Sequence, residues 1–434
     1  MSKLQELIDH LCPDGVEFKP LGSLTTWDKR FNGVDRKMQL HVISYPYVLA
    51  NVFDEIEDPS GNVRLLSTGI GGTERWTTEE KAGANLCEGE IVAIPWGGTP
   101  NVKYYKGKFV TADNRIATSS DTAVLSNKFL YYWLNNNIDL IAKTYRGAGI
   151  QHPSMLDVLS IKVPIPPLEV QDEIVKILDR FADYAVELQV ELQARRLQYE
   201  YYRNLLLTFN PSAYGCGTDD AQKISVIARG GHSYEIQWKT MGEIGTFIRG
   251  NGLQKKDFTE SGVGCIHYGQ IYTHYGTFAD KTKSFVTEGL AKKLLEVENG
   301  DIVLACTSEN IEDVAKAVAW LGKETIVTGG HSVVFKHNQN PKYIAYFMQT
   351  ALFFNQKKKY AYGAKVIDIK SEDLAKILIP IPPLELQEKI VAILDRFETL
   401  VNDLSKGLPA EIEAVKARYE YYRNKLLGFK EKPA

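Results

Sequence analysis

The chain repeats itself, and this repeat limits its possible folds more than any other feature of the sequence. The motif PIPPLEVQ at 164–171 returns as PIPPLELQ at 380–387. A second motif, YEYYRN at 199–204, returns unchanged at 419–424, at nearly the same separation along the chain. Segments that precede these motifs also align between the two halves. The sequence therefore predicts two copies of one module that has two parts.

The second part of each module is predicted to be a long helix. In the first copy, apolar residues follow a 4,3,4,3 spacing from Ile174 to Phe209 without a break, which is the pattern of a coiled-coil seam. Pro166 and Pro167 suit the entrance of this helix, because proline in the first turn loses no internal hydrogen bond. About 43 residues at ~1.5 Å each would make a rod of roughly 60–65 Å.

The second copy keeps the seam from Ile390 through Leu404 and Leu408, and it resumes the seam at Ile412 after a shift of four residues. A helix absorbs such an insertion with little rotation of its apolar face, although Gly407 and Pro409 favour a bend or an interruption. A helix with one apolar stripe must cover it, so we expect the two helices to pair. Antiparallel pairing is favoured, because it relates the modules by a pseudo-twofold axis and spares the 209–236 connection a long return.

The first part of each module is rich in glycine and aromatic residues, and it predicts short strands bounded by turns. These parts have diverged strongly between the two copies, whereas the helices have not. The predicted fold class is mixed, α+β: two α/β domains separated by two long antiparallel coiled-coil helices, with an internal pseudo-twofold repeat. The predicted boundaries are 1–160 for the first domain, 161–210 for the first helix, 211–232 for a linker, 233–376 for the second domain and 377–434 for the second helix.

Composition excludes several classes of protein. The 434 residues, with 44% hydrophobic and 24% charged residues, are typical of a folded chain and not of a disordered or fibrous one. Five scattered cysteines without a C-x-x-C spacing indicate neither a disulfide framework nor a zinc ribbon, and they favour a reducing, cytoplasmic location. The eight histidines show no metal-ligand spacing. No apolar run is long enough to cross a membrane, and the N-terminus lacks a signal-peptide pattern.

Two dissimilar domains held apart by a spacer match the twofold geometry of duplex DNA, which indicates a bipartite and asymmetric target. The helix motifs also resemble a known family. PIPPLE-x-Q, the following IV-x-ILDRF and YEYYRN are similar to the spacer helices of the specificity subunits of type I restriction-modification enzymes, and the likeness covers the entire chain. It implies that the two diverged parts are target recognition domains that bind double-stranded DNA.

The resemblance also implies partners and cofactors. The helices would dock two methyltransferase subunits, and restriction subunits would join the complex. S-adenosylmethionine would serve the methyltransferase, and ATP with Mg²⁺ the restriction subunit, so this chain would hold no cofactor, no metal and no catalytic residue. The sequence agrees, since it contains neither a D/N-P-P-Y/F segment nor a phosphate-binding G-x-x-x-x-G-K-S/T loop. The alternatives are an enzyme fused to DNA readers and a protein scaffold that never touches DNA, which the net charge of −3 permits.

Candidate DNA contacts are basic, aromatic and polar residues on predicted loops, because phosphates attract cations and base edges need hydrogen-bonding side chains. Two glycine-rich loops, at 146–152 and 362–365, occupy equivalent places between each domain and its helix. The alternative for each candidate is a solvated loop or a simple domain-linking turn. The candidates are Lys29, Arg30, Arg36, Lys37, Arg75, Trp96, Lys103, Arg146 and Gln151 in the first domain, and Arg249, Lys255, Lys256, Gln270, Ser308, His331, Lys357, Tyr362 and Lys365 in the second.

Candidate contacts with partner subunits lie on the helices. Tyr199 and Tyr202 fall on the seam and are predicted to be core residues. Positions off the seam combine tyrosine with arginine, a composition that is enriched at protein interfaces. The candidates are Arg180, Tyr201, Arg203, Arg396, Tyr421 and Arg423.

Overall fold

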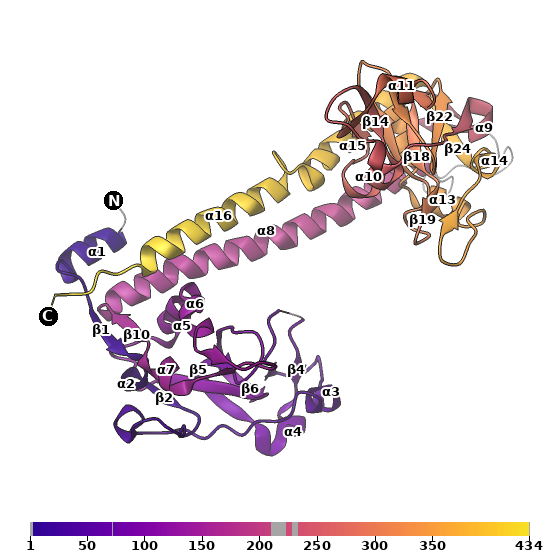
Figure 1. Cartoon of the computed structure of the whole chain (residues 1–434). Coiled ribbons are helices and arrows are strands. Elements are labelled where there is room, and N and C mark those ends of the chain that lie inside the picture. The colour runs from indigo at the N-terminus through magenta and orange to yellow at the C-terminus, as the bar shows by residue number, and fades with distance from the viewer. Residues whose placement is uncertain (1–2, 72, 210–222, 228–232, 434) are drawn as a thin grey trace. The chain divides into compact units, whose positions relative to one another are not determined.

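The computed structural model describes residues 3–71, 73–209, 223–227 and 233–433. The chain divides into two compact units, of which the first comprises 1–187 with 412–434 and the second 188–411 (Figure 1). Each unit therefore contains one α/β domain together with helical segments from both modules. Of the predicted linker, 223–227 is described and forms a strand; the other linker residues lie outside the described part of the chain.

The first domain is built on a six-stranded sheet with the order β2-β7-β5-β6-β3-β4. A separate antiparallel pair, β1 with β10, brings the start of the domain to its end, directly before the long helix. The elements are α1 Lys3–Leu11, β1 Glu17–Pro20, α2 Leu21–Leu24, β2 Thr25–Trp27, α3 Val52–Ile56, β3 Val63–Leu66, β4 Trp76–Thr77, α4 Glu79–Ala82, β5 Cys87–Pro95, β6 Lys103–Thr111, β7 Asn114–Ser119, α5 Asn127–Asn136, α6 Ile138–Ala142, β8 Tyr145–Arg146, β9 His152–Pro153, α7 Met155–Ser160 and β10 Lys162–Ile165.

The second domain repeats this plan. The strand order β13-β22-β18-β20 corresponds to β2-β7-β5-β6, and β12 pairs with β24 as β1 pairs with β10. The elements are β11 Lys223–Ile227, β12 Ser233–Thr240, α9 Met241–Ile244, β13 Gly245–Arg249, β14 Val263–Ile266, α10 Tyr268–Thr273, β15 Phe278–Ala279, β16 Ser284–Val286, α11 Glu288–Ala291, β17 Leu295–Val297, β18 Ile302–Ala305, β19 Thr307–Ser308, β20 Lys316–Trp320, β21 Ile326–Thr328, β22 Ser332–His337, α12 Pro341–Phe347, α13 Ala351–Lys357, β23 Ile367–Asp368, α14 Ser371–Leu374 and β24 Leu378–Ile381.

The first predicted helix is α8, Leu168–Thr208, an unbroken helix of 41 residues. In the first unit, the ring of Phe181 on α8 packs against Tyr419 and Tyr422 of helix α16, Leu408–Leu427. Lys162, just before α8, pairs with Glu431 beyond the end of α16, so the two helical segments run antiparallel within this unit (Figure 1).

In the second unit the same contact recurs with the modules exchanged. Phe397 of α15, Leu384–Asn402, stacks on Tyr199 and Tyr202 of α8. Tyr199 is buried, as the seam predicts, but Tyr202 keeps 37% of its surface exposed beside the phenylalanine ring. The pairing of two long helices through the seam is confirmed.

The second helix is interrupted, which settles the alternative that the sequence left open at Gly407 and Pro409. Helix α15 ends at Asn402, and α16 begins at Leu408. A Cβ atom at Gly407 would overlap the Thr399 carbonyl oxygen, so only glycine permits this close turn against the end of α15. The prediction that Leu404 lies on the seam is wrong, because it falls in the break and is 80% exposed.

A polar connection fixes each domain to the helix that follows it. In the first unit the Asp179 carboxylate of α8 accepts hydrogen bonds from Lys128 and Tyr132 of α5, at 2.7 and 2.6 Å. In the second unit the Asp395 carboxylate of α15 accepts equivalent bonds from Lys342 and Tyr346 of α12, both at 2.7 Å. Divergence of the domains has therefore preserved the residues that hold them to the helices.

A buried glutamine completes each connection. The Gln171 side chain accepts from the Ser126 backbone N–H at the start of α5 and donates to the Val124 and Pro166 carbonyl oxygens. Gln387 accepts in the same way from the Asn340 N–H at the start of α12. Both side chains are fully buried, so each bond replaces one that water would otherwise make.

Gln171→Ala tests the importance of this connection. The change removes the side-chain partner of three backbone groups, and we expect a loss of about 1–3 kcal/mol in the free energy of unfolding. Urea unfolding of the full chain measures it. Gln193→Ala, at an exposed position of the same helix, serves as the control. Equal stability of the two variants would show that the glutamine does not secure the domain.

Candidate DNA interface

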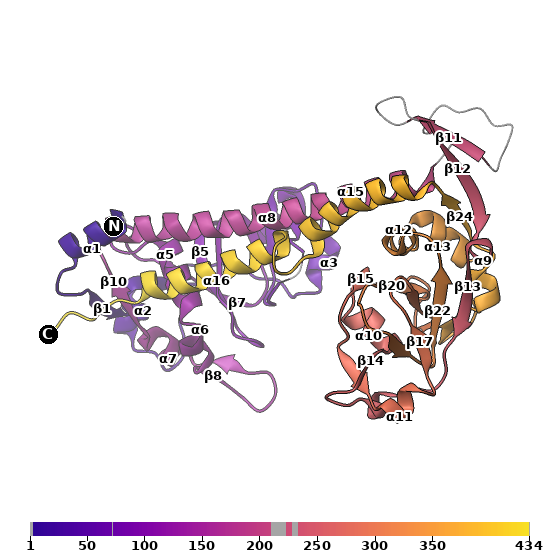
Figure 2. The same ribbon diagram turned by 90° about the horizontal axis from the view of Figure 1, so that it is seen from above.

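The glycine-rich loop of the first domain forms a short hairpin. Strands β8 and β9 pair Tyr145 with Pro153 and Arg146 with His152, and residues 147–151 make the turn (Figure 2). The carbonyl oxygen of Gln151 accepts a 3.1 Å hydrogen bond from the Gly98 N–H, so the hairpin lies on the segment that follows the central strand β5. All residues from Arg146 to His152 are exposed.

Aromatic and basic side chains gather beside this hairpin. The Trp96 ring lies 5.3 Å from the His152 ring, and the Trp96 carbonyl oxygen is 2.7 Å from Nδ1 of that histidine. The Arg115 guanidinium carbon lies 4.7 Å from the centre of the same indole, and its Nη1 pairs with Asp28 at 3.0 Å. The Lys29 ammonium lies 5.8 Å from the indole centre and remains exposed. The structure thus brings Lys29, Trp96 and Gln151 together, as the sequence could not.

The second domain forms an equivalent hairpin. Tyr362 and Asp368 exchange both backbone hydrogen bonds, at 3.0 and 2.8 Å, around a turn that contains the exposed Lys365. Strand β23 also pairs with β19, so Ile367 lies opposite Ser308 in the segment that follows the central strand β18. The position of this hairpin in the domain therefore matches that of the first.

Side chains of the second domain gather at the same place. The Arg249 guanidinium pairs with the Asp368 carboxylate at 3.0 Å, and this pairing raises the pKa of Arg249 above its usual value. The exposed His331 ring lies 5.1 Å from the Tyr268 ring, and the His331 carbonyl oxygen accepts from the Cys306 N–H. Arg249, Ser308, His331, Tyr362 and Lys365 thus belong to one surface around the hairpin.

Other candidates lie away from the hairpins or are engaged in ion pairs. Arg30 donates to the carbonyl oxygens of Gln39 and Leu40. Arg75 forms ion pairs with Asp54 and Glu57. Four exposed basic residues occupy two single-turn helices, Arg36–Met38 and Lys255–Asp257: Arg36, Lys37, Lys255 and Lys256.

Two DNA-contact candidates of the second domain are buried, whereas the sequence placed both on exposed loops. Lys357 is buried, and its ammonium donates to the carbonyl oxygens of Glu312 and Val314. Gln270 is buried at the start of α10, where its side chain accepts from the His267 N–H and donates to Ser284. Both side chains satisfy internal groups of the domain and do not face solvent.

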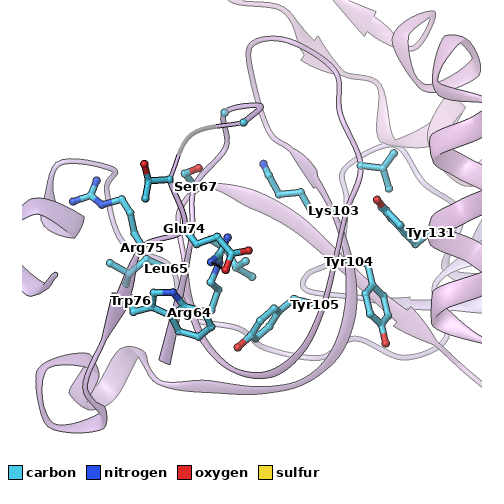
Figure 3. Close-up of a pocket in the computed structure, with 15 residues that line it drawn as sticks. Arg64, Leu65, Ser67, Glu74, Arg75, Trp76, Lys103, Tyr104, Tyr105 and Tyr131 are labelled. Atoms are coloured by element: carbon cyan, nitrogen blue, oxygen red, sulfur yellow. Dashed lines mark ion pairs between the residues drawn. The ribbon is translucent and has the colours of Figure 1, made fainter. Parts of the chain in front are cut away.

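Lys103 lines a pocket of about 370 Å³ in the first domain (Figure 3). The walls come from β3, β4, β6 and the segment between β3 and β4, and they include Arg64, Trp76 and Tyr105. The Lys103 ammonium is buried, and the described residues offer it no hydrogen-bond partner. Burial lowers the pKa of this lysine from 10.5 to about 8. Burial of the charged Lys103 ammonium therefore lowers the stability of the folded domain. This lysine does not lie on the hairpin surface.

Lys103→Met tests this burial through pH. The folded state disfavours the charged ammonium below pH 8, and this penalty disappears as the pH rises towards 10.5, where the unfolded chain also loses the proton. We expect the variant to raise the midpoint of urea unfolding at pH 7 and the gain to shrink between pH 8 and 10.5. Lys143→Met, at an exposed lysine, should give no such pH-dependent gain. A gain that is independent of pH would contradict a buried charge.

The candidates for partner contacts separate into two groups. Tyr201 and Tyr421 are each 62% exposed, and Arg180 and Arg396 are exposed as well. The other two arginines are engaged within their own units, which the sequence did not predict. Arg203 bonds Gln349 and lies over the Tyr199 ring; Arg423 bonds Asn136 and lies over the Tyr419 ring.

Several residues of the two surfaces were not singled out from the sequence. Arg115 supports Trp96 from inside the sheet, Tyr47 lies 6.0 Å from the Lys29 ammonium, and Asp368 holds Arg249. The repeat contained a signal for one of them, because Asp368 aligns with His152 when the two PIPPLE motifs are superimposed. The other two depend on distant strand pairing, which local sequence does not reveal.

A comparison with known protein families finds the same two-fold repeat of a domain and a helix. A family model described as the type I restriction modification DNA specificity domain matches residues 39–195 and again 235–414. The chain belongs to this family. Each match covers most of one domain and continues into the helix that follows it, so the family model finds the same internal repeat.

Individual relatives agree with the family model. The chain is 28% identical to the type I restriction enzyme EcoR124I/EcoR124II specificity subunit of Escherichia coli, over 99% of this chain and 97% of that one. It is 30% identical to a putative type I restriction enzyme specificity subunit of Haemophilus influenzae, over 79% and 83% of the two chains. The crystal structure of an S subunit from M. genitalium shares the fold, with a TM-score of 0.53 and 15% identity over 95% and 96%.

Specificity subunits are the non-catalytic, DNA-recognition subunits of restriction-modification enzymes, so this chain is not itself an enzyme. The family does not itself bind a cofactor. Within the described residues, no group of three or more His, Cys, Asp or Glu side chains could hold a metal ion. None of the described helices is long and apolar enough to span a bilayer.

Proposed function

We propose that this specificity subunit binds duplex DNA at a bipartite, asymmetric target and that each hairpin surface contacts one half-site. One observation carries the proposal: the two domains present the same hairpin on the same strand framework, but with different side chains around it. The first surface offers Lys29, Arg146 and Gln151. The second offers Arg249 and Lys365 as cations, together with Ser308, His331 and Tyr362. A shared frame with different side chains suits two readers of different sequences.

The side-chain chemistry supports this division of roles. Lys29, Arg146 and Lys365 are exposed cations that can neutralise phosphates and set the register on the duplex. Gln151 and Ser308 carry donors and acceptors that can read base edges. Arg249 combines both abilities, because its planar fork can contact a phosphate or a guanine.

We infer that the helices seat the partner subunits. The exposed Tyr201 and Tyr421 occupy equivalent positions of α8 and α16, so two copies of one methyltransferase subunit could use the same contact twice. Arg180 and Arg396 add exposed charges at a second pair of equivalent positions. Restriction subunits would then join this complex, and S-adenosylmethionine, ATP and Mg²⁺ would belong to the partners. A solved structure with a TM-score of 0.52 to this chain was described in connection with complex assembly of a type I system.

A reducing cytoplasm is the location that this function requires, since chromosomal DNA and the partner subunits are found there. The four described cysteines are Cys12, Cys87, Cys265 and Cys306, and all are buried free thiols. Burial raises the pKa of Cys87 to about 11, which keeps this thiol protonated and unreactive.

Methylation of host DNA tests the proposed function. The chain is produced with its methyltransferase subunit, and single-molecule sequencing maps methylated adenines with and without it. We expect a two-part motif that appears only with this chain. Binding of that duplex should also weaken steeply with salt, because phosphate contacts release counterions. A stable complex that yields no new motif and no salt dependence would favour a scaffold that never touches DNA.

Deletion of four residues from α8, at 193–196, tests whether the helix sets the distance between half-sites. A helix loses ~1.5 Å per residue, so the spacer shortens by about 6 Å. We expect both halves of the methylated motif to persist and the gap between them to change by about one or two base pairs. The control replaces Gln193, Arg195 and Arg196 with alanine, which keeps the length of the helix. An unchanged gap in the deletion variant would exclude the helix as the ruler.

A further inference from the structure

The two hairpins share three positions although their domains have diverged. Gly147, Ala148 and Ile150 of the first correspond to Gly363, Ala364 and Val366 of the second, in the alignment that superimposes the two PIPPLE motifs. Other positions differ: Arg146 corresponds to Tyr362, and Gly149 to Lys365. The shared part of the hairpin is thus its turn and one β-branched apolar residue.

The glycine determines how this turn closes. Gly147 has φ of +139° and Gly363 has φ of +118°, a conformation that side chains disfavour. A Cβ atom at Gly147 would lie 3.0 Å from the Ile150 carbonyl oxygen, and one at Gly363 would overlap the Val366 carbonyl oxygen. In both hairpins the backbone of the apolar residue therefore packs directly on the glycine, which fixes that residue in the turn.

The apolar side chains face solvent. Ile150 is 72% exposed and Val366 is 59% exposed. One exposed apolar residue needs no explanation. Two of them, at equivalent positions of a fixed turn in otherwise diverged domains, indicate a common use. An apolar residue that both domains keep, although they contact different half-sites, is expected to act in the same way at each half-site.

Cations surround both turns. Arg146 and Lys29 belong to the first surface, and Lys365 lies next to Val366 in the second. Lys370 extends the second surface, with its ammonium 5.6 Å from the centre of the Tyr362 ring. Proteins that bend DNA combine such features, with basic residues on the backbone and an apolar side chain inserted between base pairs.

We propose that Ile150 and Val366 are a pair of apolar wedges, each of which inserts between two base pairs of its half-site and partly separates them. This inference rests on the proposed function and deepens it. The wedge does not read sequence; it deforms the duplex at the place where the neighbouring side chains read it. Its rigid turn limits the loss of conformational freedom on binding.

The test uses the full chain in complex with its methyltransferase subunits and a duplex that carries the methylated motif. 2-Aminopurine replaces adenine at successive positions, and its fluorescence rises where stacking is lost. We expect a rise within each half-site. Ile150→Ala should abolish the rise in one half-site, Val366→Ala in the other, and each should weaken binding about tenfold. Leu156→Ala and Leu378→Ala, both at apolar positions that are 45% exposed outside the hairpins, should change neither signal.

Two further comparisons separate a wedge from other contacts. Ile150→Ala should leave the salt dependence of binding unchanged, whereas Arg146→Ala should reduce its slope by about one. Uracil in place of each thymine tests a contact with a thymine methyl group: if uracil removes the difference between Ile150→Ala and the unaltered chain, base-pair separation is overturned. If both hairpin variants give the same fluorescence rise as the unaltered chain, the wedge is overturned. If binding of the same duplex still weakens with salt, the proposed function stands. If the complex with the unaltered chain shows no salt-dependent binding of the duplex, the wedge and the proposed function are both overturned.

Discussion

The whole chain depends on one aromatic contact that it makes twice. Phe181 packs on Tyr419 and Tyr422, and the equivalent Phe397 packs on the tyrosines of α8. Each contact joins a helix of one module to a helix of the other. Each compact unit therefore contains residues from both modules, and neither domain is held only by the helix of its own module. A repeat that pairs with itself in this way needs its helices to stay alike, which explains why they have diverged so little.

The domains are free to diverge because their attachment is confined to few residues. Asp179 and Asp395 each accept from a lysine and a tyrosine, and Gln171 and Gln387 each bond the start of a domain helix. The hairpin lies elsewhere in each domain, on the segment after the central strand. Substitutions around the hairpin therefore need not disturb the attachment. Two domains that contact different half-sites, as proposed, can therefore be attached to the helices in the same way.

Sequence periodicity predicted the helices because burial follows a regular spacing along them, as at Ile174 and Ile390. It failed at Leu404, where the Gly407 turn removes the residue from the seam. The surface candidates were harder to predict, because composition does not reveal which lysines face solvent: Lys357 is buried, whereas Lys365 is exposed. Contacts with distant segments decide this, because the Lys357 ammonium at the end of α13 bonds the Glu312 and Val314 carbonyl oxygens. Strand pairing decides in the same way that Arg115 lies against Trp96.

The ion pairs of the hairpin surfaces explain how a chain with a net charge of −3 can present cations to DNA. Arg249 pairs with Asp368, and Arg146 pairs with Asp157, and in both pairs the arginine remains well exposed. Such pairs contribute only about 0–1 kcal/mol in water, so a phosphate can replace the carboxylate at little cost. Until then the carboxylate holds the guanidinium in place and offsets its charge. In this proposal, the carboxylates balance the charge of these arginines in the absence of DNA. The arginines can therefore bind phosphates although the whole chain is not basic.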